Sequence, residues 1–426
     1  MSTKPSPAVV VLDGLSDIRS WQEDLYRDIH QHPELSHQEH RTADLVVERL
    51  QAAGYEVQDG IGGTGVVGIL RNGNGPSVLM RSEMDALPVK EATGLPYAST
   101  VRATDAAGND VPVTHACGHD VHVTCLLGAA ALLAGATQHW HGTAIALFQP
   151  SEELGDGARG MVEDGLAKAL PLVDVALAQH VLPAPAGHVG THRGRALSAA
   201  DSIRITLHGR GTHGSMPQAG VDPVVLAAMI VLRLQTIVSR EVAPTDTVVL
   251  TVGSIHAGSK SNVIVDHAVL ELNLRTYDEA VRVTVLEAIR RIVVAECQAS
   301  NSPKEPEFEL YDRFPLTVND DDVTDRVSGA FAGYFGERFK TMAAQSASED
   351  FSDIPAALGV PYTYWGIGGI DERQYREAAD AGRVNQDIPA TIRRPLRRSS
   401  SPPWTPAPKH SWSPRWRGSP PDSLPS

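Results

Sequence analysis

Residues 142–153, GTAIALFQPSEE, carry the pattern that decides the fold: an apolar run, Gly142 to Phe148, passes directly into polar residues. Two other runs, Ser77 to Arg81 and Val173 to Leu177, end in the same way. Helical stretches such as Val121 to Ala134 alternate with them, which is typical of a largely parallel sheet covered by helices on both faces. Ligands of such sheets gather outside the carboxyl ends of the strands. We therefore expect an α/β fold with its chemistry just after each run.

Two helices are expected before this sheet. Apolar residues recur at helical spacing between Trp21 and Gln51, and Pro33 marks a break between the two helices. Four histidines lie in the same stretch: His30, His32, His37 and His40. A histidine-rich tract can bind metal, but we interpret these residues as surface helix and turn residues.

The pattern changes between about Arg195 and Tyr311, where we predict the order strand, helix, strand, strand, helix, strand. The segments are Asp201 to His208, Asp222 to Arg240, Thr245 to Ile255, Ala268 to Arg275, Asp278 to Ala299 and Glu305 to Leu310. Asp222 and Asp278 are suited to cap the two helices. This β-α-β-β-α-β order is that of a ferredoxin-like unit, which we interpret as an α+β domain inserted into the first.

Length and charge narrow the function. A chain of 426 residues is too long for one ordinary core. A net charge of -14 argues against nucleic acid as a partner. Three widely spaced cysteines make no disulfide framework and fit a reducing cytoplasm. The apolar run Val9 to Leu12 is too short for a signal peptide or a membrane span. We expect a cytoplasmic protein with a small-molecule substrate and no membrane partner.

The strongest local cluster is HACGHDVH, residues 115–122. Thiolate and imidazole are preferred ligands of zinc and its neighbours, and Cys117 and His119 on one turn can face the same metal centre. Alone, the cluster also fits a cysteine nucleophile with its base, or a buried thiol near a helix start.

Three other polar groups follow apolar runs. Glu152 and Glu153 repel each other unless cations offset their charge. In an extended stretch their side chains point opposite ways, so one can bind metal while the other acts as general base; a solvated acidic loop gives the same pair. His180 lies at the same sheet edge, and Asp85 is placed to orient a ligating imidazole.

Together these motifs resemble the M20 metallopeptidase family in its amidohydrolase branch, which includes hippurate hydrolases, aminoacylases and auxin-conjugate hydrolases. The likeness runs from about residue 20 to residue 389. Its motifs, in order, are Asp85-Ala-Leu-Pro, Cys117-Gly-His119-Asp120-x-His122, Glu152-Glu153, Gln179-His180, Gly211 to Pro217, Gly253-Ser254, Asn262-Val263-Ile264, Arg275-Thr276, Ser348-Glu349-Asp350-Phe351 and Gly366 to Gly369.

The resemblance implies a catalytic domain made of residues 1–194 and 312–389, with a mixed, largely parallel sheet flanked by helices. Residues 195–311 would form the ferredoxin-like dimerisation (lid) domain. It also implies two divalent metal ions, Zn²⁺ or Mn²⁺ and also Co²⁺ or Ni²⁺. Cys117 would bridge them, His119 and His180 would complete one site, and Glu153 would bind the other.

The same resemblance implies hydrolysis of N-acyl amino acids to a carboxylic acid and a free amino acid, with Glu152 as general base. Asp85 and His122 would support the ligands from behind. In a homodimer, His213 would reach the active site of the other subunit. Arg275 and Asn262 look like contacts to the substrate carboxylate and the transition state. Arg275 pairing with Asp278 or Glu279 is the alternative.

Two departures from the family stand out. Glu83 occupies a position where the family usually has Asp, and we expect a small effect from the extra methylene. The family also continues after Asp-Ile-Pro with Asn-His-Ser-Pro, whose histidine is the remaining ligand of the metal held by Glu153. Here Asp387-Ile388-Pro389 is followed by no such histidine.

The composition of residues 390–426, rich in Arg, Pro and Ser, predicts disorder. Codons allowed for Ala390 to Arg394, read in a shifted frame, spell Asn-His-Ser-Pro. We hypothesise a base lost near codon 390, which resequencing tests. If the tail is genuine, an alternative is a folded, dimeric metal-binding homologue with impaired catalysis. A third interpretation, a hydrolase that uses Cys117 as nucleophile, predicts activity that survives chelation.

Overall fold

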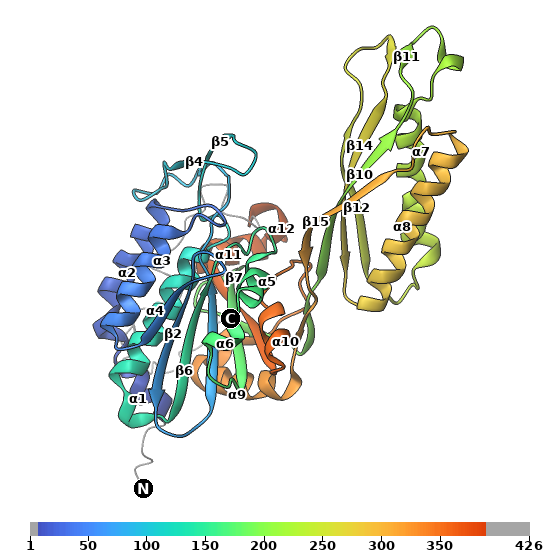
Figure 1. The fold of residues 1–426 in the computed structure, drawn as a ribbon. Coiled ribbons are helices and arrows are strands. Elements are labelled where there is room, and N and C mark those ends of the chain that lie inside the picture. Colours follow the sequence, from blue (N-terminus) through green and yellow to red (C-terminus); the bar gives the residue numbers. More distant parts are fainter. Residues whose placement is uncertain (1–6, 389–426) are drawn as a thin grey trace, which may run out of the picture.

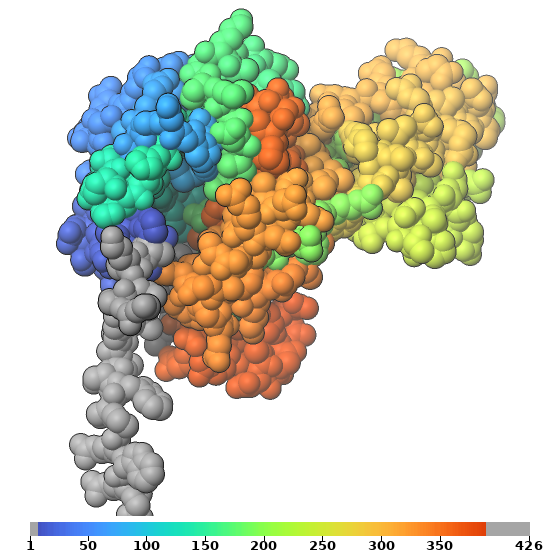
Figure 2. Space-filling model, turned by 90° about the horizontal axis from the view of Figure 1, so that it is seen from below, coloured from blue at the N-terminus to red at the C-terminus, as the bar shows by residue number. Residues whose placement is uncertain are grey.

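The computed structural model describes residues 7–388 as a larger and a smaller unit, each built around its own sheet (Figure 1). Figure 2, seen from below, shows the smaller unit projecting from the side of the larger one. The chain passes from one unit to the other beside a short ladder in which β9 (Gly194–Leu197) pairs with β16 (Thr317–Asn319). The predicted disordered tail, residues 390–426, lies outside the described residues.

The larger unit holds an eight-stranded sheet with the order β1-β2-β6-β3-β7-β18-β8-β17. The central strands β6, β3, β7 and β18 are parallel, whereas β1, β2 and β8 pair in antiparallel fashion with their inner neighbours. This confirms the mixed, largely parallel sheet. The strands are β1 (Glu56–Ile61), β2 (Gly65–Asn72), β3 (Ser77–Glu83), β6 (Gly142–Gln149), β7 (Val175–Pro185), β8 (Val189–Thr191), β17 (Phe339–Thr341) and β18 (Tyr362–Ile370).

Helices cover both faces of this sheet. On one face α2 (Leu15–Gln31), α3 (His40–Ala52) and α4 (His119–Gly135) bury residues such as Leu127 against Phe148. On the other, α5 (Gly157–Glu163), α6 (Leu166–Ala169) and α10 (Asp353–Leu358) form a second apolar layer. Each large aliphatic side chain buried in this way contributes about 1.5–3 kcal/mol. The helices predicted on either side of Pro33 are confirmed as α2 and α3.

Six further elements belong to the larger unit. These are α1 (Pro7–Asp13), β4 (Arg102–Thr104), β5 (Asp110–Pro112), α9 (Asp321–Phe335), α11 (Glu372–Asp380) and α12 (Val384–Asp387).

The smaller unit has a four-stranded antiparallel sheet with the order β12-β14-β10-β15, and both its helices pack on one face. The elements follow the predicted β-α-β-β-α-β order: β10 (Ala199–His208), α7 (Pro223–Thr236), β12 (Val248–His256), β14 (His267–Thr276), α8 (Glu279–Ala299) and β15 (Glu307–Phe314). Asp222 and Asp278 accept hydrogen bonds from backbone N–H groups in the first turns of α7 and α8, as their sequence positions predict. The role of this unit as a dimerisation (lid) domain stays a prediction.

Helix α7 is apolar on two faces. Leu226, Ile230 and Leu234 are buried in the core of the smaller unit, whereas Met229 and Leu232 are exposed. Within residues 7–388, the stretch Pro223–Glu241 is the single helical segment whose length and composition would suffice to cross a membrane. The inner face of this helix packs against the sheet of the smaller unit. No element within residues 7–388 covers its outer face.

Candidate metal centre

The motif residues meet where β3 and β6 end, beside β7. The expectation that His180 follows the end of its strand is wrong, because β7 continues to Pro185. Glu83 ends β3, His180 lies in β7, and His119 begins α4. Gly118 has a φ of 93°, in the left-handed region that favours glycine, and this turn leads from Cys117 into the helix. The convergence follows from parallel strands whose carboxyl ends share one edge of the sheet.

His119 presents an unpaired nitrogen to three carboxylates. Its Nδ1 lies 2.8 Å from the Asp85 carbonyl oxygen, so Nδ1 holds the proton and Nε2 carries the lone pair. Nε2 is buried without a hydrogen-bond partner. It lies 3.7 Å from Glu83 Oε1, 3.8 Å from Glu152 Oε2 and 4.0 Å from Glu153 Oε1. These gaps are too long for hydrogen bonds but suit donors around one cation, since ligands bound at ~2.0–2.3 Å stand roughly 3–4 Å apart.

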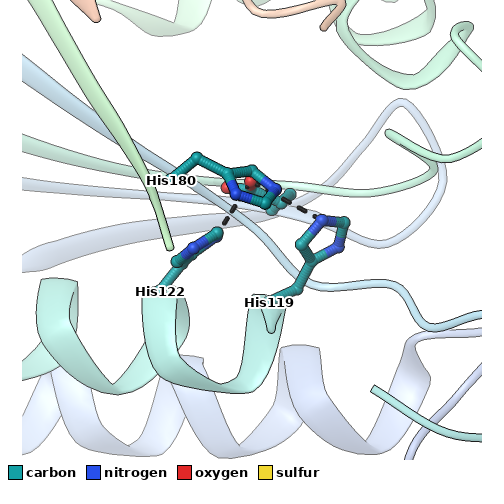
Figure 3. A group of neighbouring side chains, drawn as sticks. His119, His122 and His180 are labelled. Atoms are coloured by element: carbon teal, nitrogen blue, oxygen red, sulfur yellow. Dashed lines mark ion pairs between the residues drawn. The ribbon is translucent and has the colours of Figure 1, made fainter. Parts of the chain in front are cut away.

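Two groups of ligand atoms share His119. One contains Cys117, His119 and Glu153, and the other contains Glu83, His119, His122 and His180, with the ligand atoms of each group within 4.8 Å of one another. Cys117 Sγ lies 3.4 Å from His180 Nε2, which links the groups. Figure 3 shows His119 and His122 rising from one helix toward His180. All four predicted ligands therefore converge, and their roles as ligands stay predictions.

Buried carboxylates around this point outnumber the buried cation. Arg81 is the one Arg or Lys among the described side chains that contacts them, at 3.0 Å from Glu83, 2.7 Å from Glu349 and 3.1 Å from Asp350. The carboxylates of the region are Glu83, Asp85, Glu152, Glu153, Glu349 and Asp350. Such an excess of negative charge favours bound cations.

The pKa shifts express the same excess of charge. Burial, followed by the charges of Glu349 and Glu153, raises the pKa of Glu152 well above its ordinary value. Burial also raises the pKa of Glu153 to about 7. Burial and the neighbouring Glu153 raise the pKa of the Cys117 thiol to about 12. A thiol this hard to ionise is a poor nucleophile without a cation beside it, which weighs against the Cys117-dependent hydrolase.

The comparisons with known proteins agree with this geometry. The model of peptidase family M20/M25/M40 matches residues 79–387. The chain belongs to this family. Thermostable carboxypeptidase 1 of Saccharolobus solfataricus is 37% identical over 380 residues, which cover 87% of this chain and 92% of that protein. A hippurate hydrolase of Campylobacter jejuni is 37% identical over 339 residues, covering 79% and 85% of the two chains.

A solved structure extends the likeness to the fold. A dinuclear metal-binding peptidase of the M20 family from Bacillus subtilis superposes with a TM-score of 0.68 at 26% identity, covering 88% of this chain and 98% of that chain. The chain is thus an M20 hydrolase that acts on amide bonds, and dinuclear metal binding is a property of its family.

In this M20 hydrolase the expected extended geometry of Glu152 and Glu153 is wrong. Strand β6 ends at Gln149, and both glutamates lie in a turn that follows Ser151, whose φ is 50°. Both therefore reach toward His119 instead of pointing opposite ways. Strand alternation could not predict this, because the backbone leaves the extended conformation one residue earlier.

Glu39 holds that turn, and the sequence analysis missed it. Its buried carboxylate accepts hydrogen bonds from the backbone N–H of Ser151 at 2.9 Å, the backbone N–H of His37 at 3.0 Å and the hydroxyl of Thr64 at 2.7 Å. Burial, and then the charge of Asp85, raises the pKa of Glu39 to about 7. Nothing in the local sequence separates Glu39 from a surface residue at the start of a helix.

His30 is a second correction, because it is fully buried and not a surface residue. Its Nδ1 lies 2.6 Å from Asp120 Oδ2 and its Nε2 lies 3.1 Å from Glu91 Oε1. Burial opposes the charged form, but these carboxylates prevail and raise the pKa of His30 to about 9. His30 thereby fixes Asp120, the neighbour of His119.

The residues predicted behind the ligands have suitable contacts. Asp85 faces His119 Nδ1 with its carbonyl oxygen and with Oδ1 at 3.2 Å, and its Oδ2 accepts the Glu153 N–H at 3.0 Å. His122 Nε2 accepts the Val181 N–H at 2.8 Å. Both residues connect the candidate ligands to fixed backbone.

His213 and Asn262 do not reach the metal centre of their own chain. His213 lies on β11 (Thr212–His213), and Asn262 directly precedes β13 (Val263–Ile264). Strand β11 is at the end of the smaller unit farthest from the eight-stranded sheet (Figure 1). The two residues are adjacent, since the Gly214 N–H donates to the Asn262 carbonyl at 2.7 Å.

Arg275 lies where β14 ends, and it forms no ion pair with Asp278 or Glu279, both of which are described residues. Its Nη1 donates to the Ser346 carbonyl at 2.7 Å and contacts Ser348 Oγ at 3.1 Å. Asp278 instead binds Arg195 at 2.6 Å. Arg275 therefore joins the smaller unit to the loop that leads into Glu349.

Proposed function

We propose that this M20 hydrolase cleaves the amide bond of N-acyl amino acids and releases a carboxylic acid and a free amino acid. The observation that carries the proposal is the unpartnered His119 Nε2, buried amid carboxylates beside Cys117 and His180. The hippurate hydrolase and the carboxypeptidase among its relatives support this substrate class, because both names describe an amide next to a free carboxylate. Its free cysteines are consistent with a place in the cytoplasm.

The donor set fits divalent metal ions. Cys117 would lie between two ions, His119 and His180 would hold one of them, and Glu153 the other. Thiolate, imidazole and carboxylate together suit zinc, with manganese, cobalt and nickel as alternatives. When bound, such ions lower the pKa of a bound water and polarise the amide carbonyl.

Glu152 is the proposed general base. Its carboxylate is almost fully buried, and burial beside Glu349 and Glu153 raises its pKa, so it holds a proton readily. It would take a proton from the attacking water and return it to the departing nitrogen. Arg275 would bind the amino-acid carboxylate through a charge-assisted pair, after exchanging its present contacts with Ser346 and Ser348.

The site would be completed by a second subunit. His213 is exposed and distant from the Cys117 group of its own chain (Figure 1), so a homodimer in which the partner subunit's His213 enters the site accounts for its placement. There it would donate to the developing oxyanion, with Asn262 beside it. The outer face of α7, which exposes Val225, Met229 and Leu232, supplies an apolar surface for the dimer.

A second candidate is a metal-binding homologue with impaired catalysis. Within residues 7–388, the group around Glu153 contains Cys117 and His119 and no other histidine. Because His119 is assigned to the other ion, an ion held by Glu153 would have no imidazole of its own. Elemental analysis combined with assays separates the two: about two metals with turnover supports the enzyme, and one metal without turnover supports the impaired form.

The deciding experiment compares wild type with Glu152→Gln on N-benzoyl and N-acetyl amino acids, with and without a chelator. We expect chelation to abolish turnover and metal to restore it. Glu152→Gln should abolish turnover while the metal content stays that of wild type. Turnover that survives chelation would contradict the metal-assisted mechanism. Turnover in Glu152→Gln would contradict the role of Glu152 as general base.

A further inference from the structure

Glu83 is buried at the edge of the metal centre and is not among the ligands proposed above. It ends β3 and is 0% exposed. Its Oε1 lies 2.9 Å from His122 Nδ1 and 3.7 Å from His119 Nε2, and its Oε2 lies 3.0 Å from Arg81 Nη1. Neither carboxylate oxygen has a hydrogen bond of good geometry. Glu83 is therefore a buried anion aimed into the site with unused acceptor capacity.

The three neighbouring imidazoles are drawn in Figure 3. Their hydrogen bonds to the backbone indicate which ring nitrogen of each carries the proton. His122 Nε2 accepts the Val181 N–H, so its proton is on Nδ1, which lies 2.9 Å from Glu83 Oε1. His180 Nδ1 lies 2.7 Å from the Val181 carbonyl oxygen, so its Nε2 carries the lone pair. His119 likewise has its lone pair on Nε2. His119 and His180 can thus donate to a metal, whereas His122 positions the Glu83 carboxylate.

We propose that Glu83 is an additional ligand of the metal ion that His119 and His180 would hold. Its Oε1 lies 3.7 Å from His119 Nε2, which is the spacing of donors that share an ion, and the carboxylate also lies within 4.8 Å of the ligand atom of His180. The inference rests on the proposed metal centre and adds a donor to it. Aspartate at this position would end about 1.5 Å short, because it lacks one methylene.

Pairing with Arg81 alone is the competing explanation for Glu83. The Nε of Arg81 donates to Gln149 at 2.8 Å and its Nη2 contacts Glu349 and Asp350, so Nη1 is left to Glu83 Oε2, 3.0 Å away. This pair accounts for one oxygen of Glu83. The pair with Arg81 does not explain why Glu83 Oε1 approaches His119 and His122.

The added ligand makes the two metal positions unequal. The ion at His119 would have thiolate, two imidazoles and a carboxylate from the protein, which is a complete set for zinc. The ion at Glu153 would have Cys117 and one carboxylate within the described residues. The expected behaviour is one tightly held metal per chain and a second that is lost readily on dialysis.

The test measures metal binding and not hydrolysis. Wild type, Glu83→Asp and Glu83→Gln are titrated with Zn²⁺ against a chromogenic chelator, and the Co²⁺-loaded proteins are compared by visible absorption. Glu349→Gln is the matched control, because it removes another carboxylate partner of Arg81 without removing the proposed ligand.

Both Glu83 variants should bind the ion at His119 and His180 about 100-fold or more weakly than wild type does. A residue that only contacts a metal ligand typically changes the affinity by roughly 10–100-fold, so a larger loss indicates a ligand. Their Co²⁺ spectra should also change, while the control keeps the wild-type spectrum. An unchanged Co²⁺ spectrum in Glu83→Asp would overturn the inference and leave the proposed function standing. Wild type that binds no metal would overturn both. Glu83→Asp keeps the charge, so a result is available even where Glu83→Gln fails to fold.

Discussion

The carboxylate of Glu39 accepts a 2.9 Å hydrogen bond from the backbone N–H of Ser151, across 112 positions of sequence. Ser151 has a φ of 50° and directly precedes Glu152. A left-handed conformation is costly for a residue with a side chain, so this contact holds the turn from which the proposed base projects.

Glu39→Gln should therefore loosen the turn and lower stability. Glutamine has one acceptor oxygen where the carboxylate has two, so at least one of three donors loses its partner. We expect a loss of about 1–3 kcal/mol in the free energy of unfolding and a fall in kcat with KM little changed. Denaturant unfolding and steady-state kinetics measure the two effects. Glu48→Gln, exposed on α3, is the control, and an equal effect there would contradict the role of Glu39.

The His30 pair predicts a pH dependence of stability. Its pKa is raised from 6.5 to about 9 in the fold, by Asp120 and Glu91 against the effect of burial. The folded state thus binds this proton more tightly than the unfolded state does. The contribution is fully present below pH 6.5 and is lost as pH rises through about 9.

Urea unfolding of wild type and His30→Gln at intervals from pH 6 to pH 9.5 checks this. The difference in unfolding free energy between the two proteins should shrink as pH rises. A difference that stays constant over the range would show that His30 is neutral in the fold.

Leu232→Asp should break the proposed dimer. Leu232 is 68% exposed on the outer face of α7, and twofold symmetry places the change in the interface twice. Two buried charges in place of leucine should raise the dimer Kd by roughly 100-fold or more. Size-exclusion chromatography with light scattering measures the state. Val283→Asp, an exposed apolar position on α8, is the matched control and should remain dimeric.

Mixing two inactive variants tests whether His213 acts across subunits. Glu152→Gln and His213→Ala should each be inactive as homodimers. After unfolding and refolding together, a mixed dimer has one site with both residues intact, so an equal mixture should regain roughly a quarter of wild-type activity. Activity no higher than that of the separate variants would place His213 outside the partner subunit's site.

The C-terminal frame hypothesis makes a prediction about metal content. A gene with one base restored near codon 390 would encode Asn-His-Ser-Pro after Pro389. If that histidine completes the ion at Glu153, the metal content after dialysis should rise from about one to about two per chain. Elemental analysis checks the number. No increase would show that the histidine does not bind there.

Much of the fold was predictable because local signals agree with tertiary structure. Apolar runs that end in polar residues became β3 and β6, and the aspartates before α7 and α8 cap them as their positions predict. The cluster from Cys117 to His122 could also be predicted, because a single turn at Gly118 sets its geometry.

The remaining parts of the site depend on contacts between distant segments. Glu39 and His30 look like surface residues in sequence, and only packing against Ser151 and Asp120 reveals them as buried. The turn at Glu152 follows from a backbone conformation that another segment imposes. Glu83 could be read as a conservative replacement, because its significance depends on the distance to His119.

The crowding of acids around Arg81 also bears on how long the protein lasts in a cell. A chain without bound cations must either keep that repulsion or take up protons on acids such as Glu152 and Glu153, and both cost stability near neutral pH, so the chain opens more often. Proteases act on such opened chains, so their turnover tracks the population of the open form. On the proposed function, the supply of divalent cations therefore governs the abundance of the protein as well as the rate at which each copy works.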